Sequence, residues 1–184
     1  SRSRLRGAHN LDNAILAARI ALAVGADMDG ILAGIAAFRP LPHRLEEHRL
    51  GDLTIVNDSI STTPEATKAA LAAYPGRRIA LIAGGHEREQ DYEELAGLLA
   101  MRGVTTLVTL PVTGARLAVA TRKVAPDIRV TEAPDLETAI GALHDQRKRF
   151  DTIILSPGAP SYNQFKNFEQ RGQRFVELCQ TRFK

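Results

Sequence analysis

The 184 residues of the chain are 44% hydrophobic and 24% charged, with a net charge of +3 and only 5% aromatic residues. These values are typical of a globular domain, and scattered basic residues with so few aromatic rings argue against a nucleic-acid-binding surface. The single cysteine, Cys179, excludes an internal disulfide framework and fits a reducing compartment. No apolar stretch approaches the ~20 residues that span a bilayer. We therefore expect a cytoplasmic protein with no membrane span and no nucleic-acid partner.

Two helices are expected at the start of the chain. Residues 9–25 and 27–38 both show helical periodicity and are rich in alanine. The two prolines of the segment RPLPHR then interrupt the chain. This break predicts a boundary between a helical segment, residues 1–40, and an α/β domain, residues 41–184.

Beyond this break, strand-like and helix-like segments alternate. Residues 43–50 and 53–58 flank a Gly-Asp pair and predict an antiparallel hairpin. The remaining segments alternate between helix and strand, beginning with a helix: 64–74, 78–85, 91–103, 105–110, 113–124, 128–133, 136–150, 152–158 and about 163 to 184. This order is typical of an α/β fold: a Rossmann-like, doubly wound, mostly parallel sheet with an antiparallel edge hairpin, preceded by a short helical segment.

The most informative segment is SPGAPSYNQFKNFEQRGQRF, residues 156–175, which follows the last expected strand. Pro157 and Pro160 prevent an immediate helix, so a loop rich in hydroxyl and amide groups connects strand and helix. Ligands of open α/β sheets bind at this place, beyond the carboxyl ends of the strands. The loop suits a small carboxylate better than an apolar ligand, although an ordinary connecting loop explains the residues equally well.

A second polar cluster follows the hairpin. Asp58 ends the strand, and Ser61, Thr62 and Thr63 precede the helix expected at Pro64. An aspartate here could hold a magnesium-associated water or a ribose hydroxyl, and a helix N-terminus favours anions. These side chains could also simply cap the helix. The residues alone leave both interpretations open.

Arg44 and Asn13 are further candidates. The planar fork of Arg44 suits a phosphate, but the side chain could instead pair with Glu46 or Glu47. Asn13 lies one turn from Asn10 on the first helix, where asparagine is a mediocre interior residue. Either a ligand or a solvated helix face would account for this pair.

Gly84 and Gly85 end another expected strand and allow close backbone approach, but they form neither a phosphate-binding loop nor a dinucleotide fingerprint. The segment HEREQDYEE that follows reads either as a ligand loop or as a charged helix start. His48, His86 and His144 have no convergent ligand set, so we expect no zinc site.

Three motifs, taken in order, resemble the Mur ligase family of peptidoglycan amino-acid-adding enzymes, and in particular its glutamate-adding branch. These are GAHNLDN (7–13), LPHRLEEHRLGDLTIVNDSISTTPEAT (41–67) and SPGAPSYNQFKNFEQRG (156–172). The resemblance implies an ATP- and Mg²⁺-dependent ligase that joins glutamate to UDP-N-acetylmuramoyl-L-alanine through an acyl phosphate. It implies that residues 1–40 are the helical tail of an ATP-binding central domain and that 41–184 are the Rossmann-like C-terminal domain.

The resemblance also implies roles for individual residues. Nucleotide contacts would come from Asn13, Arg44 and Asp58. Glutamate contacts would come from Thr62, Arg88, Ser161, Tyr162 and Phe168. The chain has no G-x-x-G-K-[ST] loop, so the UDP-sugar and ATP domains, with the catalytic and metal-binding residues, would precede residue 1. We expect this chain alone to be inactive, without metal ligands, and monomeric.

One position separates two branches of the family. Where D-glutamate-adding members have a lysine, this chain has Ile60, within NDSISTTP. Together with Arg88 and the SPGAPSY loop, this resembles the branch that adds L-glutamate, which we therefore favour. The alternatives are a D-glutamate-adding ligase, a ligase similar to folylpolyglutamate synthase, and a non-catalytic Rossmann-like binding module.

Overall fold

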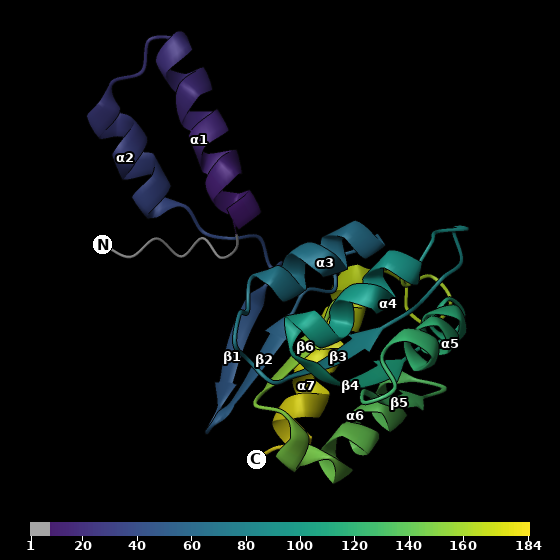
Figure 1. Ribbon diagram of the computed structural model, residues 1–184. Helices are drawn as coiled ribbons and strands as arrows, with labels where there is room; N and C mark the ends of the chain where they lie inside the picture. Colours follow the sequence, from purple (N-terminus) through teal and green to yellow (C-terminus); the bar gives the residue numbers. More distant parts are fainter. Residues whose placement is uncertain (1–7) are drawn as a thin grey trace. The chain divides into compact units, whose positions relative to one another are not determined.

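The computed structural model describes residues 8–184, and the chain divides into two units between Pro42 and His43. The first unit contains two helices, α1 (Ala8–Ala23) and α2 (Met28–Ala37) (Figure 1). Helix α2 begins where the sequence suggests, because the Asp27 carboxylate accepts a hydrogen bond from Gly30 N at 2.7 Å. Most of the large apolar side chains of these helices are exposed, among them Leu16 and Leu32.

The second unit is built on a six-stranded sheet with the order β1-β2-β6-β3-β4-β5. Only the β1–β2 pair is antiparallel, and all other neighbouring strands are parallel. The strands are β1 (Glu46–Leu50), β2 (Leu53–Asn57), β3 (Ile79–Ala83), β4 (Val104–Thr109), β5 (Arg129–Glu132) and β6 (Thr152–Leu155). This topology confirms the predicted α/β fold with its antiparallel edge hairpin.

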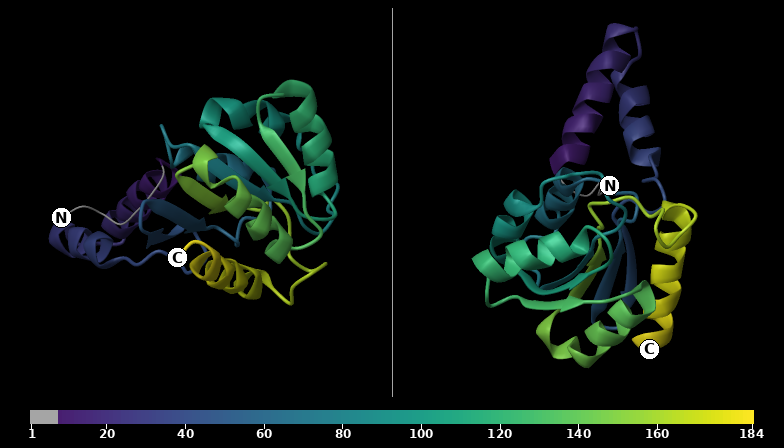
Figure 2. Two further views of the ribbon diagram at one scale, coloured as in Figure 1. Left: turned by 90° about the horizontal axis from the view of Figure 1, so that it is seen from below. Right: turned by 90° about the vertical axis from the view of Figure 1, so that its right-hand side faces the viewer.

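Helices cover both faces of the sheet (Figure 2). They are α3 (Pro64–Ala72), α4 (Glu93–Leu99), α5 (Gly114–Val124), α6 (Leu136–Asp145) and α7 (Phe168–Arg182), with short 3-10 turns at Ala100–Arg102 and Arg147–Arg149. Helices α3, α4 and α5 contribute to one apolar cluster, and α6 and α7 to another. The sheet separates the two clusters, as in a doubly wound fold.

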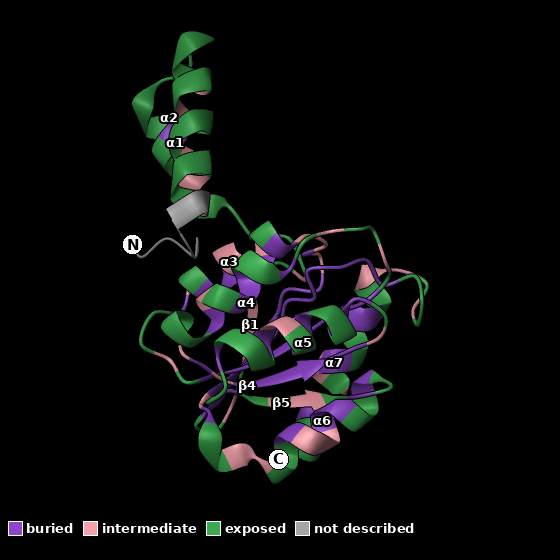
Figure 3. Cartoon of the chain, turned by 45° about the vertical axis from the view of Figure 1, so that its right-hand side comes forward, coloured by how far each residue is buried: buried purple, intermediate pink, exposed green. Residues whose placement is uncertain are grey.

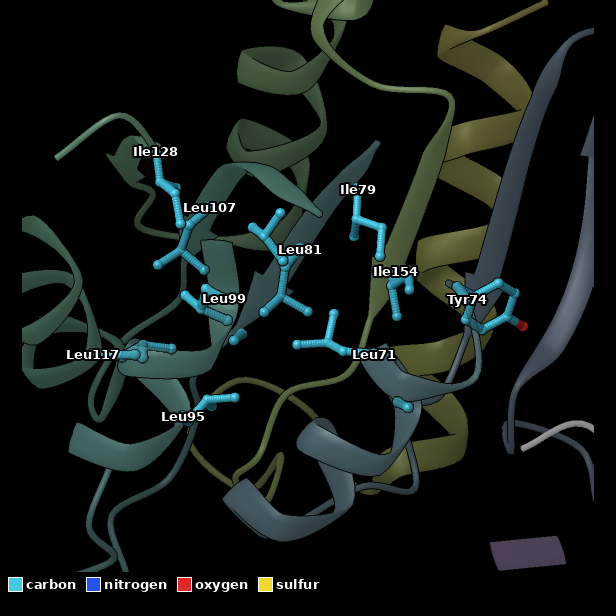
Figure 4. Packing of buried hydrophobic residues seen from close by; sticks show 14 of the residues in the cluster. Leu71, Tyr74, Ile79, Leu81, Leu95, Leu99, Leu107, Leu117, Ile128 and Ile154 are labelled. Atoms are coloured by element: carbon cyan, nitrogen blue, oxygen red, sulfur yellow. The ribbon is translucent and has the colours of Figure 1, made fainter. Parts of the chain in front are cut away.

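Alternation along the strands explains these two clusters. In β6, Ile154 belongs to the cluster with Leu71 of α3, whereas Ile153 and Leu155 belong to the cluster with Phe175 of α7. Figure 4 shows the first cluster, and Figure 3 shows the buried β4 beneath helices whose outer faces are exposed. Strands β3 and β6 therefore bury both of their faces, which accounts for their almost entirely apolar sequences.

The structure corrects the start of the last helix. The last helix begins at Phe168, not near residue 163, because the Asn167 side chain accepts a hydrogen bond from Gln170 N at 2.9 Å and caps it. Before it, Ser161 O accepts hydrogen bonds from Gln164 N and Phe165 N in a turn. The polar loop is therefore longer than the sequence suggests. No helix within residues 8–184 is both long enough and apolar enough to cross a membrane.

Candidate functional site

Three loops meet at the carboxyl edge of the parallel strands. They follow β2, β3 and β6, which lie side by side in the order β2-β6-β3. The chain goes from β2 to α3 and from β3 to α4 on one face, and from β6 to α7 on the other. Loops that diverge in this way leave a crevice at the edge of the sheet where ligands bind.

Asp58 lies below this edge and is only 3% exposed. Its Oδ2 accepts hydrogen bonds from the hydroxyls of Ser61 at 2.6 Å and Ser156 at 2.7 Å, and Oδ1 accepts from Leu45 N at 3.2 Å. Burial raises the pKa of Asp58, although these hydrogen bonds and the nearby Arg44 charge oppose the rise. Thr63, rather than Asp58, caps α3. The carboxylate therefore joins the loops after β2 and β6 to the segment before β1.

The segment before β1 is bent tightly. His43 and Leu45 have positive φ angles of 61° and 47°, which are uncommon for residues other than glycine. Ile60 N donates to His43 O, and Asn57 Nδ2 is 2.8 Å from His43 Nδ1. Arg44, between the two strained residues, is exposed. The bend thus holds the Arg44 backbone while its charged side chain faces solvent, and this strain is of the kind found at ligand sites.

Arg171 is the largest fully buried side chain, and sequence reasoning missed it. Its Nε donates to Ser59 Oγ at 3.0 Å, Nη2 to Ser59 O at 2.8 Å and Nη1 to Ala159 O at 3.1 Å. Burial lowers its pKa to about 9. Its spacing with Phe175 and Cys179, four and eight residues further along α7, places it on the core-facing side of the helix. An arginine at a core position was the available signal.

Three of the five predicted glutamate contacts lie on segments next to this arginine. Thr62, half-buried, follows Ser59 in the loop after β2, and Ser161, 3% exposed, follows Ala159 in the loop after β6. Phe168 begins α7, and its carbonyl accepts a hydrogen bond from Ser59 Oγ at 2.8 Å. The structure therefore brings the backbones that carry these three residues to one place.

Tyr162 and Arg88 lie further out. Tyr162 is 63% exposed, and its ring meets that of His86 edge-on, with centroids 6.3 Å apart. Arg88 is exposed, in a loop held by Glu87, whose carboxylate pairs with Arg116 at 2.6 Å. The hydrogen bond from Glu89 N, foremost, and the Arg116 charge lower the pKa of Glu87. Tyr162 and Arg88 thus lie on the solvent side of the loops after β6 and β3.

The paired glycines allow these loops to approach closely, as predicted. A Cβ on Gly85 would lie 2.3 Å from Pro160 O, and one on Gly84 would lie 2.3 Å from Leu110 O. Gly84 also has a φ of +110°, which favours glycine. Asn13, in contrast, is an exposed residue of α1 in the other unit. Within residues 8–184, no cluster of three His, Cys, Asp or Glu side chains is arranged to hold a metal ion.

Comparison with known sequences identifies close relatives of the chain. Residues 43–159 match the model of the Mur ligase, glutamate ligase domain. A UDP-N-acetylmuramoyl-L-alanine--L-glutamate ligase of Xanthomonas axonopodis pv. citri is 39% identical over 95% of the chain, and a UDP-N-acetylmuramoylalanine--D-glutamate ligase of Rubrobacter xylanophilus is 34% identical over 94%. The chain spans 38% and 39% of the length of these two relatives.

Solved structures share the fold. The UDP-N-acetylmuramate-alanine ligase of Thermotoga maritima matches with a TM-score of 0.71 and 17% identity, over 96% of this chain and 39% of that one. A folylpolyglutamate synthase of Mycobacterium tuberculosis, solved with ADP and AMPPCP, matches with a TM-score of 0.67 and 22% identity, over 95% of this chain and 41% of that one. At such low sequence identities, these structural similarities show only that the fold is shared. The sequence matches go further: the chain belongs to the Mur ligase family and contains its glutamate ligase domain.

Proposed function

We propose that this chain is the amino-acid-binding C-terminal domain of an ATP-dependent ligase that adds L-glutamate to UDP-N-acetylmuramoyl-L-alanine. Family membership supports the reaction class. The observation that carries the proposal is the arrangement around Arg171, which holds together the two loops carrying Thr62 and Ser161. These are the loops that a bound amino acid would have to bridge.

In this proposal the domain binds and orients glutamate. The Thr62 and Ser161 hydroxyls donate hydrogen bonds to its carboxylates, and the Arg88 guanidinium supplies a positive charge from the loop after β3. Phe168 and Tyr162 line the site. The chain's catalytic contribution is to orient the glutamate amine toward the acyl phosphate, and orientation of this kind accounts for a large part of many rate enhancements.

ATP would lie mainly on a domain that precedes this one in the sequence. Arg44 fits a phosphate contact, because it is exposed and its backbone is held in a tight bend. Asp58 fits a nucleotide hydroxyl less directly, since its oxygens already accept hydrogen bonds from Ser61, Ser156 and Leu45. A contact would require one serine hydroxyl to rotate away. The described residues offer no cluster for Mg²⁺, which we assign to the preceding domain.

The first forty residues would complete that preceding domain. Their helices expose apolar side chains such as Leu11, Ile20 and Phe38, which suits helices that pack against further protein. Asn13, on α1, would reach the nucleotide from there. The segment around Pro40 and Pro42 would be the hinge, and the whole ligase would be a cytoplasmic monomer.

The choice of L-glutamate rests on Ile60. This half-buried side chain stands where D-glutamate-adding members have a lysine, and an isoleucine cannot pair with a carboxylate. Four relatives named as L-glutamate ligases are 37–39% identical to the chain. A relative named as a D-glutamate ligase, at 34% identity, favours the alternative, a ligase that adds D-glutamate.

The test is ligation by the full-length protein that contains this chain, with ATP, UDP-N-acetylmuramoyl-L-alanine and each glutamate enantiomer in separate reactions. Phosphate release and the mass of the product are both measured. We expect product with L-glutamate and little with D-glutamate. Product with D-glutamate alone would leave the ligase but refute the choice of enantiomer, and no product with either would favour a different ligase or a binding module.

A further inference from the structure

Arg171 carries a buried positive charge without a carboxylate partner. It is 1% exposed, and its hydrogen-bond partners are a hydroxyl and two backbone carbonyls. Within the described part of the chain no Asp or Glu forms an ion pair with it, although nine contacts between other arginine or lysine side chains and carboxylates occur there. Burying an unpaired charge is costly, and isolated buried charges are accordingly rare.

The guanidinium of Arg171 connects the loops at the carboxyl edge of the sheet. Two of its nitrogens hold Ser59 in the loop after β2, and the third holds Ala159 in the loop after β6. Nη1 is also 3.3 Å from the position that a Cβ of Gly85 would occupy, in the loop after β3. The guanidinium therefore contacts two of the three loops at the carboxyl edge and adjoins the third.

We infer that Arg171 is a positioning residue for the glutamate site. Its fork sets the separation between the loops of Thr62 and Ser161, and its unneutralised charge favours an anion entering between them. The inference rests on the proposed function. Arg171 does not touch the substrate, because it is buried beneath the loops; it acts through Ser59 and Ala159.

The test uses the full-length ligase with Arg171→Met, which keeps most of the apolar volume but removes the fork and the charge, and Arg171→Lys, which keeps the charge. Arg174→Met is the matched control: Arg174 lies one turn further along α7, is exposed, and pairs with Glu137 and Glu177. We expect Arg171→Met to raise the KM for glutamate at least about tenfold, because the loops that carry Thr62 and Ser161 would no longer be held at a fixed separation. The KM for ATP should stay within about twofold.

The lysine variant should lie between the wild type and Arg171→Met, since charge returns without the fork. The control should match the wild type. An unchanged KM for glutamate would overturn the inference, because glutamate binding would then not depend on Arg171; equal rises in both KM values would do the same, because the effect would not be specific to the glutamate site. If the wild type itself makes no product with glutamate, the proposed function has failed, which is a separate outcome.

A second measurement needs only the 184-residue chain and no substrate. Amide hydrogen exchange in Arg171→Met should become faster in residues 59–62 and 159–162, while β3 and β4 keep their protection. Arg174→Met should show neither change. Unchanged exchange in both loops would overturn the positioning role. If the methionine variant does not fold, the same comparison is made with Arg171→Lys, and loops as protected as in the wild type would again refute the inference.

Discussion

The two edges of the sheet differ in how their least exposed charged groups are paired. At the amino edge, arginines pair with carboxylates at the surface: Arg77 Nε lies 3.2 Å from Asp151, and Arg147 Nη2 lies 2.7 Å from Asp52. At the carboxyl edge, Arg171 and Asp58 are buried, and hydroxyls or backbone groups take the place of ion-pair partners.

This difference distinguishes charged groups at the surface from charged groups that are buried without an ion-pair partner. Surface ion pairs contribute little to stability and are easily accommodated. Buried, unpaired charges reduce stability, and proteins retain such groups chiefly at functional sites. The comparison therefore supports the proposed site at the carboxyl edge, and the following changes test it.

The largest effect is expected for Gly85→Ala at the carboxyl edge. The new Cβ would lie 2.3 Å from Pro160 O, and the loop after β6 would have to shift. Overpacking of this kind lowers the free energy of unfolding by about 2–3 kcal/mol. Urea unfolding of the wild-type and variant 184-residue chains measures this difference in the free energy of unfolding.

Gly97→Ala is the matched control. Gly97 is exposed within α4 and nothing lies within 4 Å of its added Cβ, so this substitution should stabilise the chain by about 0.5–1 kcal/mol. Equal effects of the two substitutions would mean that the loops are not closely packed.

A smaller, pH-dependent effect is expected for Asp58→Asn. Because burial raises the folded-state pKa of Asp58 above 3.8, the folded state binds a proton more tightly than the unfolded state. Protonation of Asp58 therefore stabilises the folded state. This stabilisation is fully present below pH 3.8 and is lost as the pH rises through the raised pKa. Between these two values the wild type should lose up to about 1.4 kcal/mol per pH unit relative to the variant.

Urea unfolding of both proteins at several pH values checks this difference. Above the raised pKa the difference should be constant. A difference that does not change anywhere with pH would show that Asp58 is not the group that titrates.

The smallest effect is expected at the amino edge. Asp52 is 90% exposed in its side chain, so Asp52→Ala should change the free energy of unfolding by less than about 1 kcal/mol. The small change should shrink further in high salt, because screening weakens an exposed pair. If Asp52→Ala lowered the free energy of unfolding as much as Gly85→Ala, the two edges of the sheet would not differ in this respect.

Much of the fold could be predicted from local patterns. Apolar runs such as the one at 79–83 identify buried strands, and the Gly-Asp turn identifies the hairpin. The start of α7 could not be predicted closely because Asn163 and Asn167 are both suitable helix caps, and the cap at Asn167 and the turn at Ser161 decide the boundary. Helix ends of this kind are difficult to place from sequence to within a few residues.

The site was only partly visible in the sequence. Side chains in the loops after β2 and β6 could be selected as polar groups at strand ends, and their adjacency follows from the strand order. Arg171 could not be selected in this way, because it lies on a helix and its partners, Ser59 and Ala159, are 112 and 12 residues away. Whether an arginine is buried depends on the tertiary structure. In the sequence, only the four-residue spacing of Arg171, Phe175 and Cys179 along α7 indicates it.

The most direct test of the account compares one threonine from each edge in the full-length ligase. Thr62→Val removes a hydroxyl at the carboxyl edge, and Thr105→Val removes one at the amino edge, where Thr105 Oγ1 donates to Arg149 O at 2.9 Å. We predict that Thr62→Val raises the KM for glutamate at least about tenfold and leaves the KM for ATP unchanged, whereas Thr105→Val changes neither. Equal glutamate KM values in the two variants would contradict the assignment of the carboxyl edge as the amino-acid site.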